Sequence, residues 1–206
     1  MCGRFALHAS PEVVALQFGL GGVPAFTPRY NIAPTAPVLV VRADGAVTVR
    51  WGLVPRWAKD ASMGTRMINA RAETVASKPA FRDAYRARRC LIPASGFYEW
   101  RTERGLRQPY YARPTGAALF AFAGLWERWR DLETCAIVTT AANDAMRPIH
   151  DRMPVIVAQS DYRRWLEGAE DLLRPAPSSA LELVRVTRAV NDARNESPGL
   201  IEPEKT

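Results

Sequence analysis

The fold-determining stretch of this sequence is Arg89-Cys90-Leu91-Ile92-Pro93-Ala94-Ser95-Gly96-Phe97-Tyr98-Glu99-Trp100. Apolar and aromatic residues fill it, and such residues are typical of buried β-strands. Proline and glycine interrupt strands, because proline lacks the backbone donor and glycine has no side chain to pack. We therefore predict two strands in this stretch, with kinks at Pro93 and Gly96.

Further strand patterns lie on both sides of this stretch. Short apolar runs bounded by turn residues predict strands at residues 38–42, 47–53, 108–113, 119–126, 135–140, 155–158 and 181–186. Helical patterns are fewer, and they cover residues 11–20 after Ser10 as N-cap, residues 79–89, and residues 161–167 after Ser160 as N-cap. Residues 24–37 hold four prolines and predict an ordered loop.

The balance of these elements indicates the fold class. Strands outnumber helices and do not alternate regularly with them, which argues against a doubly wound parallel sheet. We predict an α+β fold, a single domain over residues 1–206 with mainly antiparallel sheets in a barrel-like arrangement and peripheral helices. Residues 191–206 are predicted to form a polar C-terminal tail.

Composition is typical of a globular protein. Of the 206 residues, 48% are hydrophobic, which is enough for the core of one domain. No apolar run approaches the ~20 residues of a membrane helix, and the first residues lack the pattern of a secretory signal, so we expect a cytoplasmic protein. The net charge is +7, and only three of the 28 basic residues are lysine. An arginine excess permits a nucleic-acid partner without establishing one.

The chain begins Met1-Cys2-Gly3-Arg4-Phe5, and Cys2 is the first candidate for chemistry. Removal of Met1 would give Cys2 a free α-amine beside its thiol, and both groups ordinarily titrate near ~8 to 8.5. Each is then a nucleophile at cellular pH, and we expect Cys2 to be exposed. The alternative is that Cys2 is an incidental residue on a frayed terminus.

Four polar residues elsewhere could assist that chemistry. His150 lies in a loop between apolar strands and is a candidate general acid or base, with a structural histidine as the alternative. Aromatic neighbours should desolvate Glu99 and raise its carboxyl pKa, which suits proton transfer; a strand carboxylate paired with arginine is the alternative. Asn69 and Arg71 share one face of an extended stretch. They could hold a carbonyl and a phosphate, or form a sheet-capping pair.

Aromatic residues in the predicted loops suit base stacking, although such residues are more often core anchors. They are Phe26, Tyr30, Trp51, Trp57 and Trp100. The sequence contains no glycine-rich phosphate loop, no HExxH and no CxxC pair. Its three cysteines are widely spaced, and the two besides Cys2 look like buried strand residues. We therefore predict neither a metal site nor a nucleotide cofactor.

Taken together, eight motifs in this order resemble those of the SRAP family, the SOS response-associated peptidase-like proteins. They are MCGRF (1–5), PRYNIAP (28–34), WGL (51–53), NARAET (69–74), RCLIPASGFYEW (89–100), AGLW (123–126), TTAAN (139–143) and HDRMP (150–154). The longest of them is the most specific, and the resemblance spans nearly the whole chain.

The resemblance implies a mixed domain of antiparallel sheets in a barrel-like arrangement, and it implies an activity. SRAP-like proteins recognise abasic sites in single-stranded DNA and attach to them covalently through the N-terminal cysteine, which shields the lesion. The α-amine of Cys2 would form a Schiff base with the open-ring aldehyde, and the thiol would then close a thiazolidine ring. A lyase side reaction and an autoproteolytic peptidase activity ahead of Cys2 are further implied activities.

The resemblance also implies roles residue by residue. His150 resembles the residue that assists sugar ring opening, Glu99 the carboxylate that moves protons beside the terminal amine, and Asn69 the amide that holds the terminal residue or sugar. DNA-binding positions are implied at Arg4, Asn31, Pro34, Trp57, Arg71, Trp100, Thr140 and Arg152. Among these, the two arginines Arg4 and Arg71 would meet phosphates, and Trp57 would splay the neighbouring bases.

The implied partner is single-stranded DNA containing an abasic site, bound by a monomer that is nucleoid-associated while on DNA, with no membrane, metal or nucleotide cofactor. Two other functions stay open. Glutamine amidotransferase domains also begin Met-Cys-Gly, so Cys2 could serve an N-terminal-nucleophile thiol peptidase or amidohydrolase. A module that binds single strands by charge and stacking alone would not need Cys2.

Overall fold

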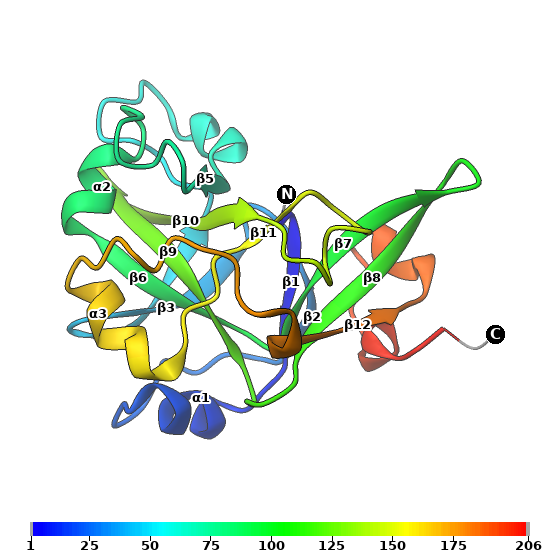
Figure 1. The fold of residues 1–206 in the computed structure, drawn as a ribbon. Coiled ribbons are helices and arrows are strands. Elements are labelled where there is room, and N and C mark those ends of the chain that lie inside the picture. Colours follow the sequence, from blue (N-terminus) through cyan, green and yellow to red (C-terminus); the bar gives the residue numbers. More distant parts are fainter. Residues whose placement is uncertain (1, 205–206) are drawn as a thin grey trace.

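A computed structural model describes residues 2–204, and a closed barrel of β-strands forms its centre (Figure 1). The barrel strands are β3 (Pro37–Arg42), β4 (Gly45–Trp51), β6 (Arg89–Ala94), β9 (Phe120–Trp129) and β10 (Leu132–Ala141). They follow one another in the order β10-β4-β3-β6-β9, and β9 pairs with β10 to close the ring. The predicted α+β class with a barrel-like arrangement is confirmed.

A five-stranded sheet accompanies the barrel, in the order β12-β8-β7-β1-β2. Its strands are β1 (Arg4–Leu7), β2 (Arg29–Ile32), β7 (Gly96–Glu103), β8 (Leu106–Pro114) and β12 (Leu181–Arg185). All of these pairings are antiparallel. Because β1 lies between β7 and β2, the beginning of the chain is held on both sides within this sheet.

Residues 89–100 connect the two sheets, since β6 belongs to the barrel and β7 to the five-stranded sheet. The chain passes from one to the other at Ser95 and Gly96. A Cβ atom on Gly96 would overlap the ring of Tyr111 and would lie 2.5 Å from the carbonyl oxygen of Ala112. Only glycine therefore lets β7 and β8 approach so closely at this crossing point.

The kink predicted at Pro93 is absent, because Pro93 pairs with Ala121 inside β6. β3 pairs with β6 only at Leu91, so one side of Pro93 has no ladder hydrogen bond to lose. Not every pairing is antiparallel, either. β10 runs parallel to both β4 and the short strand β5 (Asn69–Arg71), and antiparallel to β11 (Arg152–Pro154).

Several predicted boundaries shift. The loop predicted at 24–37 contains β2, and the strand predicted at 155–158 is replaced by β11, with one isolated bridge at Ile156. Helix α1 (Pro11–Phe18) begins after Ser10 as predicted but ends earlier, because Gly19 adopts φ 65° and caps it. Helices α2 (Arg82–Ala87) and α3 (Tyr162–Leu166) are also shorter than predicted, and Ser160 is not the cap of α3.

Single turns of 3-10 helix complete the fold at Ala61–Arg66, Gln159–Asp161, Ser178–Ala180, Arg188–Asn191 and Pro198–Ile201. The last of them lies in the region predicted as a polar tail, and the one before it ends where that region begins. There Leu200 is buried, and the Glu196 carboxylate accepts hydrogen bonds from the backbone of Tyr30 and Asn31 on β2. Residues 191–204 therefore pack along the five-stranded sheet instead of extending into solvent.

The largest core cluster joins the two sheets through aromatic side chains. Phe5 of β1 meets Trp51 of β4 edge-on at 5.2 Å between ring centroids, and Phe97 of β7 meets Phe122 of β9 at 5.8 Å. Cys2, the first residue that the structure describes, also belongs to this cluster. Within residues 2–204, no helix is long and apolar enough to cross a membrane.

Candidate active site

The first residues are held in place by strand pairing. Arg4 and Phe5 of β1 lie opposite Tyr98 and Phe97 of β7, and continuing this register places Gly3 opposite Glu99. Cys2 follows next and is completely buried, with its thiol 4.0 Å from the carbonyl oxygen of Arg4. The expectation of an exposed Cys2 is therefore wrong, because the strand carries it into the aromatic core.

Burial changes the chemistry expected of the thiol. The loss of water around Cys2 raises its pKa well above the usual range, and the nearby negative charge of Glu99 adds to this rise. The thiol is then protonated at neutral pH, contrary to the prediction of a partly ionised group. The expected removal of Met1 concerns a residue that lies outside the described part of the chain.

Asn69 contacts Cys2 directly. Its Nδ2 donates a hydrogen bond to the Cys2 carbonyl oxygen at 2.9 Å, and β5 holds Asn69 beside Ile137 of β10. The other amide atom, Oδ1, is buried and has no hydrogen-bond partner among residues 2–204. A buried acceptor without a partner is costly, so Oδ1 is suited to accept a hydrogen bond from a ligand.

Glu99 is buried on the core side of β7. Glu99 lies two residues after Phe97 on β7, so both side chains point to the same face of the strand. Burial raises the pKa of the Glu99 carboxyl, and the positive charge that His150 carries when protonated opposes the rise. The prediction of a desolvated carboxyl with a raised pKa agrees with this environment, and the expected aromatic neighbour Trp100 lies on the opposite face.

His150 lies at the end of the loop between β10 and β11. The Asn143 side chain holds this loop, because its Oδ1 accepts from the backbone of Met146 at 2.9 Å and its Nδ2 donates to the Ala176 carbonyl oxygen at 2.9 Å. The backbone N–H of His150 donates to the Met146 carbonyl oxygen at 3.0 Å. These bonds fix where the imidazole enters the site.

The contacts that the imidazole can make depend on where its proton lies. Nδ1 lies 2.9 Å from the backbone nitrogen of Arg152 and also 2.9 Å from Oδ1 of Asp151. The two contacts exclude each other, since Nδ1 must be unprotonated to accept from Arg152 and protonated to donate to Asp151. The neutral ring that accepts from Arg152 carries its proton on Nε2, which faces Oε2 of Glu99 at 3.9 Å.

Glu99 and His150 border a cavity of about 430 Å³, whereas Cys2 and Asn69 are not among its lining residues. Its walls are formed by Gly3, Arg4, Pro34, Glu99, Trp100, Arg107, His150 and Asn191. Five of the eight were predicted site residues, and the structure therefore brings them to one place. Sequence reasoning missed Arg107. The available signal was a group of three arginines, Arg101, Arg104 and Arg107, around the Gly105 turn.

The structure places two predicted DNA-binding residues in an internal network. Arg4 donates to Oδ1 of Asn31 at 2.6 Å and to the Val190 carbonyl oxygen at 2.9 Å. Nδ2 of Asn31 donates to carbonyl oxygens of residues 190, 192 and 195. Arg4 still borders the cavity, but Asn31 is completely buried and offers no surface to DNA; its role here is to hold the C-terminal segment.

Three other predicted positions lie on adjacent strands beside Asn69. Arg71 ends β5 opposite Thr139 and is exposed, whereas Thr140 on β10 is 5% exposed. Arg152 of β11 forms a bidentate ion pair with Glu73 at 2.6 and 2.9 Å. Of the three side chains, Arg71 is the one with open access to a phosphate.

Trp57 lies in a loop and is not among the residues that border the cavity. It is 58% exposed, an unusual position for a tryptophan. Its neighbours are fixed, because Arg56 pairs with Glu127 at 2.8 Å and the Trp129 indole donates to the Ala58 carbonyl oxygen at 2.9 Å. The loop thus presents the indole to solvent from a rigid base.

No group of three or more His, Cys, Asp or Glu residues is arranged to hold a metal ion anywhere in residues 2–204. The groups at the cavity that suit proton transfer are the buried carboxyl of Glu99 and the imidazole of His150, and the Cys2 thiol lies near Glu99.

Comparison with known proteins shows to which family the chain belongs. The model of the SOS response associated peptidase (SRAP) family matches residues 1–193. The chain belongs to the SRAP family. The SRAP chain is 40% identical to the abasic site processing protein YoaM of Bacillus subtilis, over 99% of both chains. It is also 31% identical to the abasic site processing protein HMCES of Gallus gallus, over 86% of this chain and 67% of the relative.

The SRAP fold is found among solved structures as well. A crystal structure of a protein from Bacteroides thetaiotaomicron superposes with a TM-score of 0.89 at 24% sequence identity, and the match covers 99% of this chain and 100% of that one. This similarity concerns the fold, which the SRAP chain shares over its whole length.

Proposed function

We propose that this SRAP protein recognises abasic sites in single-stranded DNA and forms a covalent thiazolidine crosslink through Cys2 once Met1 has been removed. The relatives' names, abasic site processing proteins, support the lesion as the substrate. The observation that carries the mechanism is the hydrogen bond from Asn69 to the Cys2 carbonyl oxygen, which holds the chain end beside Glu99 and His150.

The reaction needs no external oxidant or cofactor. The Cys2 α-amine adds to the C1′ aldehyde of the open-ring sugar, and the carbinolamine loses water to give an imine. The Cys2 sulfur then adds to the imine carbon while its proton passes to the nitrogen, which closes the five-membered ring. The adduct has the combined mass of protein and DNA less one water. Because both nucleophiles belong to one residue, the second step is intramolecular and fast.

The residues around the cavity suit these steps. Glu99, whose carboxyl pKa is raised by burial, can in its protonated form give a proton to the departing hydroxyl group of the carbinolamine. His150, with its Nε2 proton directed at Glu99, can return that proton and can assist ring opening of the sugar. The buried Oδ1 of Asn69 can accept from the terminal amine or a sugar hydroxyl.

The raised pKa of the Cys2 thiol bears on the alternative of a thiol peptidase or amidohydrolase. Those enzymes attack a carbonyl with a thiolate as the first nucleophile. In the buried site the protonated thiol is a poor first nucleophile. It is suited to a second step in which the imine is already formed beside it. We assign the peptidase activity in the family's name to removal of the residue ahead of Cys2.

Intact-mass spectrometry after mixing the protein with an abasic oligonucleotide tests the proposal. We expect a denaturation-resistant adduct, one water lighter than the sum, that disappears with Cys2→Ala and with an oligonucleotide carrying the tetrahydrofuran analogue, which has no aldehyde. A protein with one extra residue ahead of Cys2 should bind but not react. An adduct from that blocked protein would overturn the aminothiol mechanism, and turnover of glutamine or peptides without any adduct would favour the hydrolase.

A further inference from the structure

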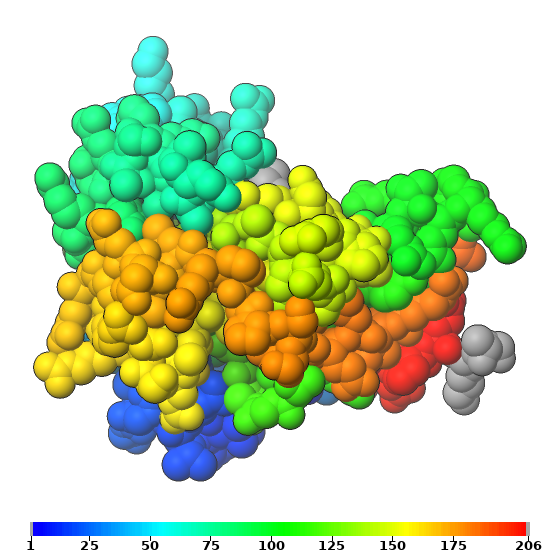
Figure 2. Space-filling view, viewed as in Figure 1, coloured from blue at the N-terminus to red at the C-terminus, as the bar shows by residue number. Residues whose placement is uncertain are grey.

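The β7–β8 hairpin extends beyond the sheet to which it belongs. β1 pairs with β7 only as far as Tyr98, and β12 pairs with β8 only from Tyr110 onward. Residues 100–109 therefore form a two-stranded ribbon with no neighbouring strand, and it projects from one end of the molecule (Figures 1 and 2). Arg104 and Gly105 turn its tip with φ 49° and 78°, the left-handed values of a tight hairpin.

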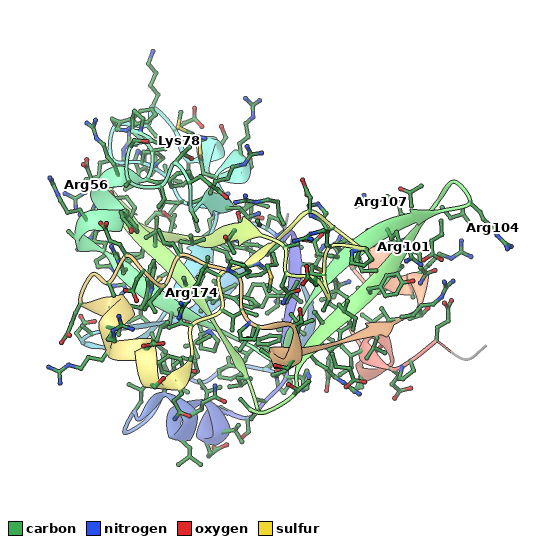
Figure 3. All side chains as sticks on the ribbon, in the orientation of Figure 1. Arg56, Lys78, Arg101, Arg104, Arg107 and Arg174 are labelled. Carbon is green, nitrogen blue, oxygen red and sulfur yellow. The ribbon has the colours of Figure 1, made fainter. Side chains whose placement is uncertain are left out.

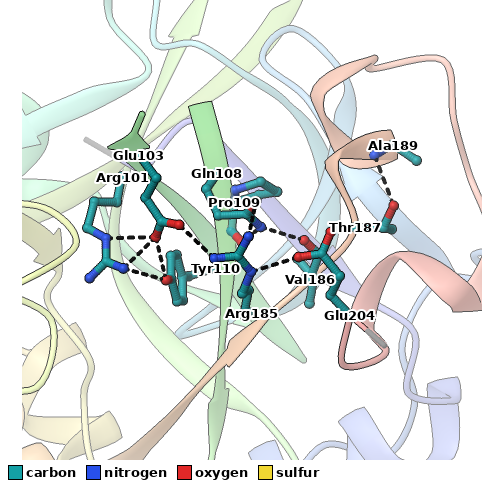
Figure 4. A network of polar contacts seen from close by, with 10 residues as sticks. All are labelled: Arg101, Glu103, Gln108, Pro109, Tyr110, Arg185, Val186, Thr187, Ala189 and Glu204. Atoms are coloured by element: carbon teal, nitrogen blue, oxygen red, sulfur yellow. Dashed lines mark hydrogen bonds and ion pairs between the residues drawn. The ribbon is translucent and has the colours of Figure 1, made fainter. Parts of the chain in front are cut away.

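An isolated two-stranded ribbon is marginal in water, and this one is braced by polar contacts of Glu103, which lies next to the turn. Glu103 accepts hydrogen bonds from Tyr110, Arg101 and Arg185, and the Arg185 guanidinium also binds Glu204 at 2.7 Å (Figure 4). The bonds from Tyr110 and Arg101 lower the pKa of the Glu103 carboxyl to about 2. The brace is thus ionised across the physiological range and holds the ribbon in one orientation.

Two arginines of the ribbon are left outside this brace. Figure 3 shows Arg101, Arg104 and Arg107 together on the hairpin. Arg101 is neutralised by Glu103, whereas neither Arg104 nor Arg107 forms an ion pair with any residue of the described chain. Such guanidinium groups are free to bind phosphate.

Arg107 connects the ribbon to the active-site cavity. It borders that cavity together with Glu99 and His150, and its guanidinium lies 5.3 Å from the centre of the Trp100 ring. The Trp100 indole is itself fixed by a 2.6 Å hydrogen bond to Oδ1 of Asn191. A single DNA strand that enters the cavity at Arg107 would also reach Arg104, which lies three residues, or roughly 10 Å, further along the ribbon.

We propose that the β7–β8 ribbon is a DNA-binding arm, in which Arg107 contacts a phosphate at the mouth of the cavity and Arg104 a phosphate of the adjoining flank. The arm rests on the proposed function, because it takes single-stranded DNA as its ligand. Neighbouring bases can stack on Trp100, as in other single-strand binding sites. The arm would let the protein hold the lesion by one flank before any covalent bond forms.

The salt dependence of binding to a tetrahydrofuran oligonucleotide tests the arm without any crosslinking. The slope of log K against log salt is negative. Removing one arginine–phosphate interaction with single-stranded DNA reduces the magnitude of this slope by about 0.7. We expect this decrease with Arg107→Gln and again with Arg104→Gln, each with several-fold weaker binding. Arg107→Lys should keep the slope. Arg113→Gln is the matched control, since it removes the same charge from β8 at a residue already paired with Glu182.

Oligonucleotides shortened on the 5′ or the 3′ side of the lesion then locate the phosphate that Arg104 binds. The affinities of wild type and Arg104→Gln should converge when the flank held by the arm is removed and should stay apart when the other is removed. The proposed arm would be contradicted if the salt slopes of the arginine variants were unchanged or if Arg113→Gln showed the same decrease. It would also be contradicted if the affinity difference between wild type and Arg104→Gln survived both truncations. Absence of an adduct between the wild type and aldehyde-bearing DNA would instead contradict the crosslinking function. The salt slopes would still test the arm, because they are measured without crosslinking.

Discussion

The side-chain amide of Asn69 donates a hydrogen bond to the carbonyl oxygen of Cys2 at 2.9 Å, and this bond links the chain end to a strand 67 residues further on. Strand pairing of β1 with β7 fixes the direction from which Cys2 arrives. The amide then fixes the end of that approach. A terminal residue held from two sides can present its amine to a substrate in a defined orientation.

Substitution of Asn69 tests the value of that bond. Asn69→Ala removes the donor and should lower the free energy of unfolding by about 1 kcal/mol, and a decrease of that size in the stabilisation of the transition state slows adduct formation roughly fivefold. Asn69→Asp keeps the shape but replaces the donor with an acceptor, so it should be at least as slow. Single-turnover adduct formation on denaturing gels measures the rate, and a wild-type rate in Asn69→Asp would show that the donor is dispensable.

Glu99 is expected to make stability depend on pH. Its carboxyl titrates near ~4.3 in the unfolded chain and at a higher pKa when buried in the fold. Between these two values the folded state binds more protons, so the free energy of unfolding falls as pH rises through that window. Glu99→Gln should therefore match the wild type near pH 4 and exceed it at pH 7 in urea denaturation, and an equal stability at both pH values would contradict the assignment.

The same substitution should impair the reaction. Removal of a proton donor at the carbinolamine step costs roughly 100-fold or more in rate. At pH 7, Glu99→Gln would then have a higher free energy of unfolding than the wild type and a lower rate of adduct formation. Glu182→Gln on β12 serves as a control with the same substitution away from the cavity, and it should form the adduct at the wild-type rate.

Two substitutions of His150, by asparagine and by glutamine, separate the roles of its two ring nitrogens. Asparagine places its amide near Nδ1 and keeps an acceptor for the Arg152 N–H, whereas glutamine reaches the position of Nε2, which faces Glu99. Asn should preserve the loop and hence the melting temperature, but it should slow adduct formation by about 100-fold. Gln should retain more activity than Asn. Equal rates for the two variants would show that Nε2 takes no part.

Glu127 is predicted to stabilise the loop that carries Trp57. Its buried carboxylate pairs with Arg88 at 2.6 Å and with Arg56 at 2.8 Å. Glu127→Ala leaves the largely buried Arg88 without its partner and should lower the free energy of unfolding by about 3 kcal/mol. The Arg56 side chain is 63% exposed, so Arg56→Ala should lower the free energy of unfolding by less than about 1 kcal/mol. Urea denaturation compares the two, and equal decreases would contradict this ranking.

Local patterns predicted most of the fold. Apolar runs between turns located the barrel strands approximately, and the Gly96 crossing was visible as an interruption of a strong strand pattern. The distant pairing partners were not visible, because β10 pairs with β4 and β5 at distances along the chain that no local pattern encodes. β2 was missed because its four residues lie among prolines.

Sequence motifs named the residues of the candidate site but not the environment in which the structure places them. Cys2, Asn69, Glu99 and His150 could be named from motifs, yet the burial of Cys2 depends on β1 entering the middle of a sheet. Asn31 illustrates the converse. Its motif suggested a surface role, and only the packing of residues 190–195 against it reveals a buried amide with every group bonded.

The central position of β1 has a consequence for the order of events during synthesis. Ala6 pairs with Gly96, so the partner strand leaves the ribosome 90 residues later, which at about 5 to 20 residues per second is a delay of roughly 5 to 20 seconds. Throughout that interval Cys2 belongs to a nascent chain without its neighbour, and an aminopeptidase can reach the residue ahead of it. Once β7 has docked, Cys2 itself is buried, so the proposed crosslinking function favours removal of the preceding residue during this interval.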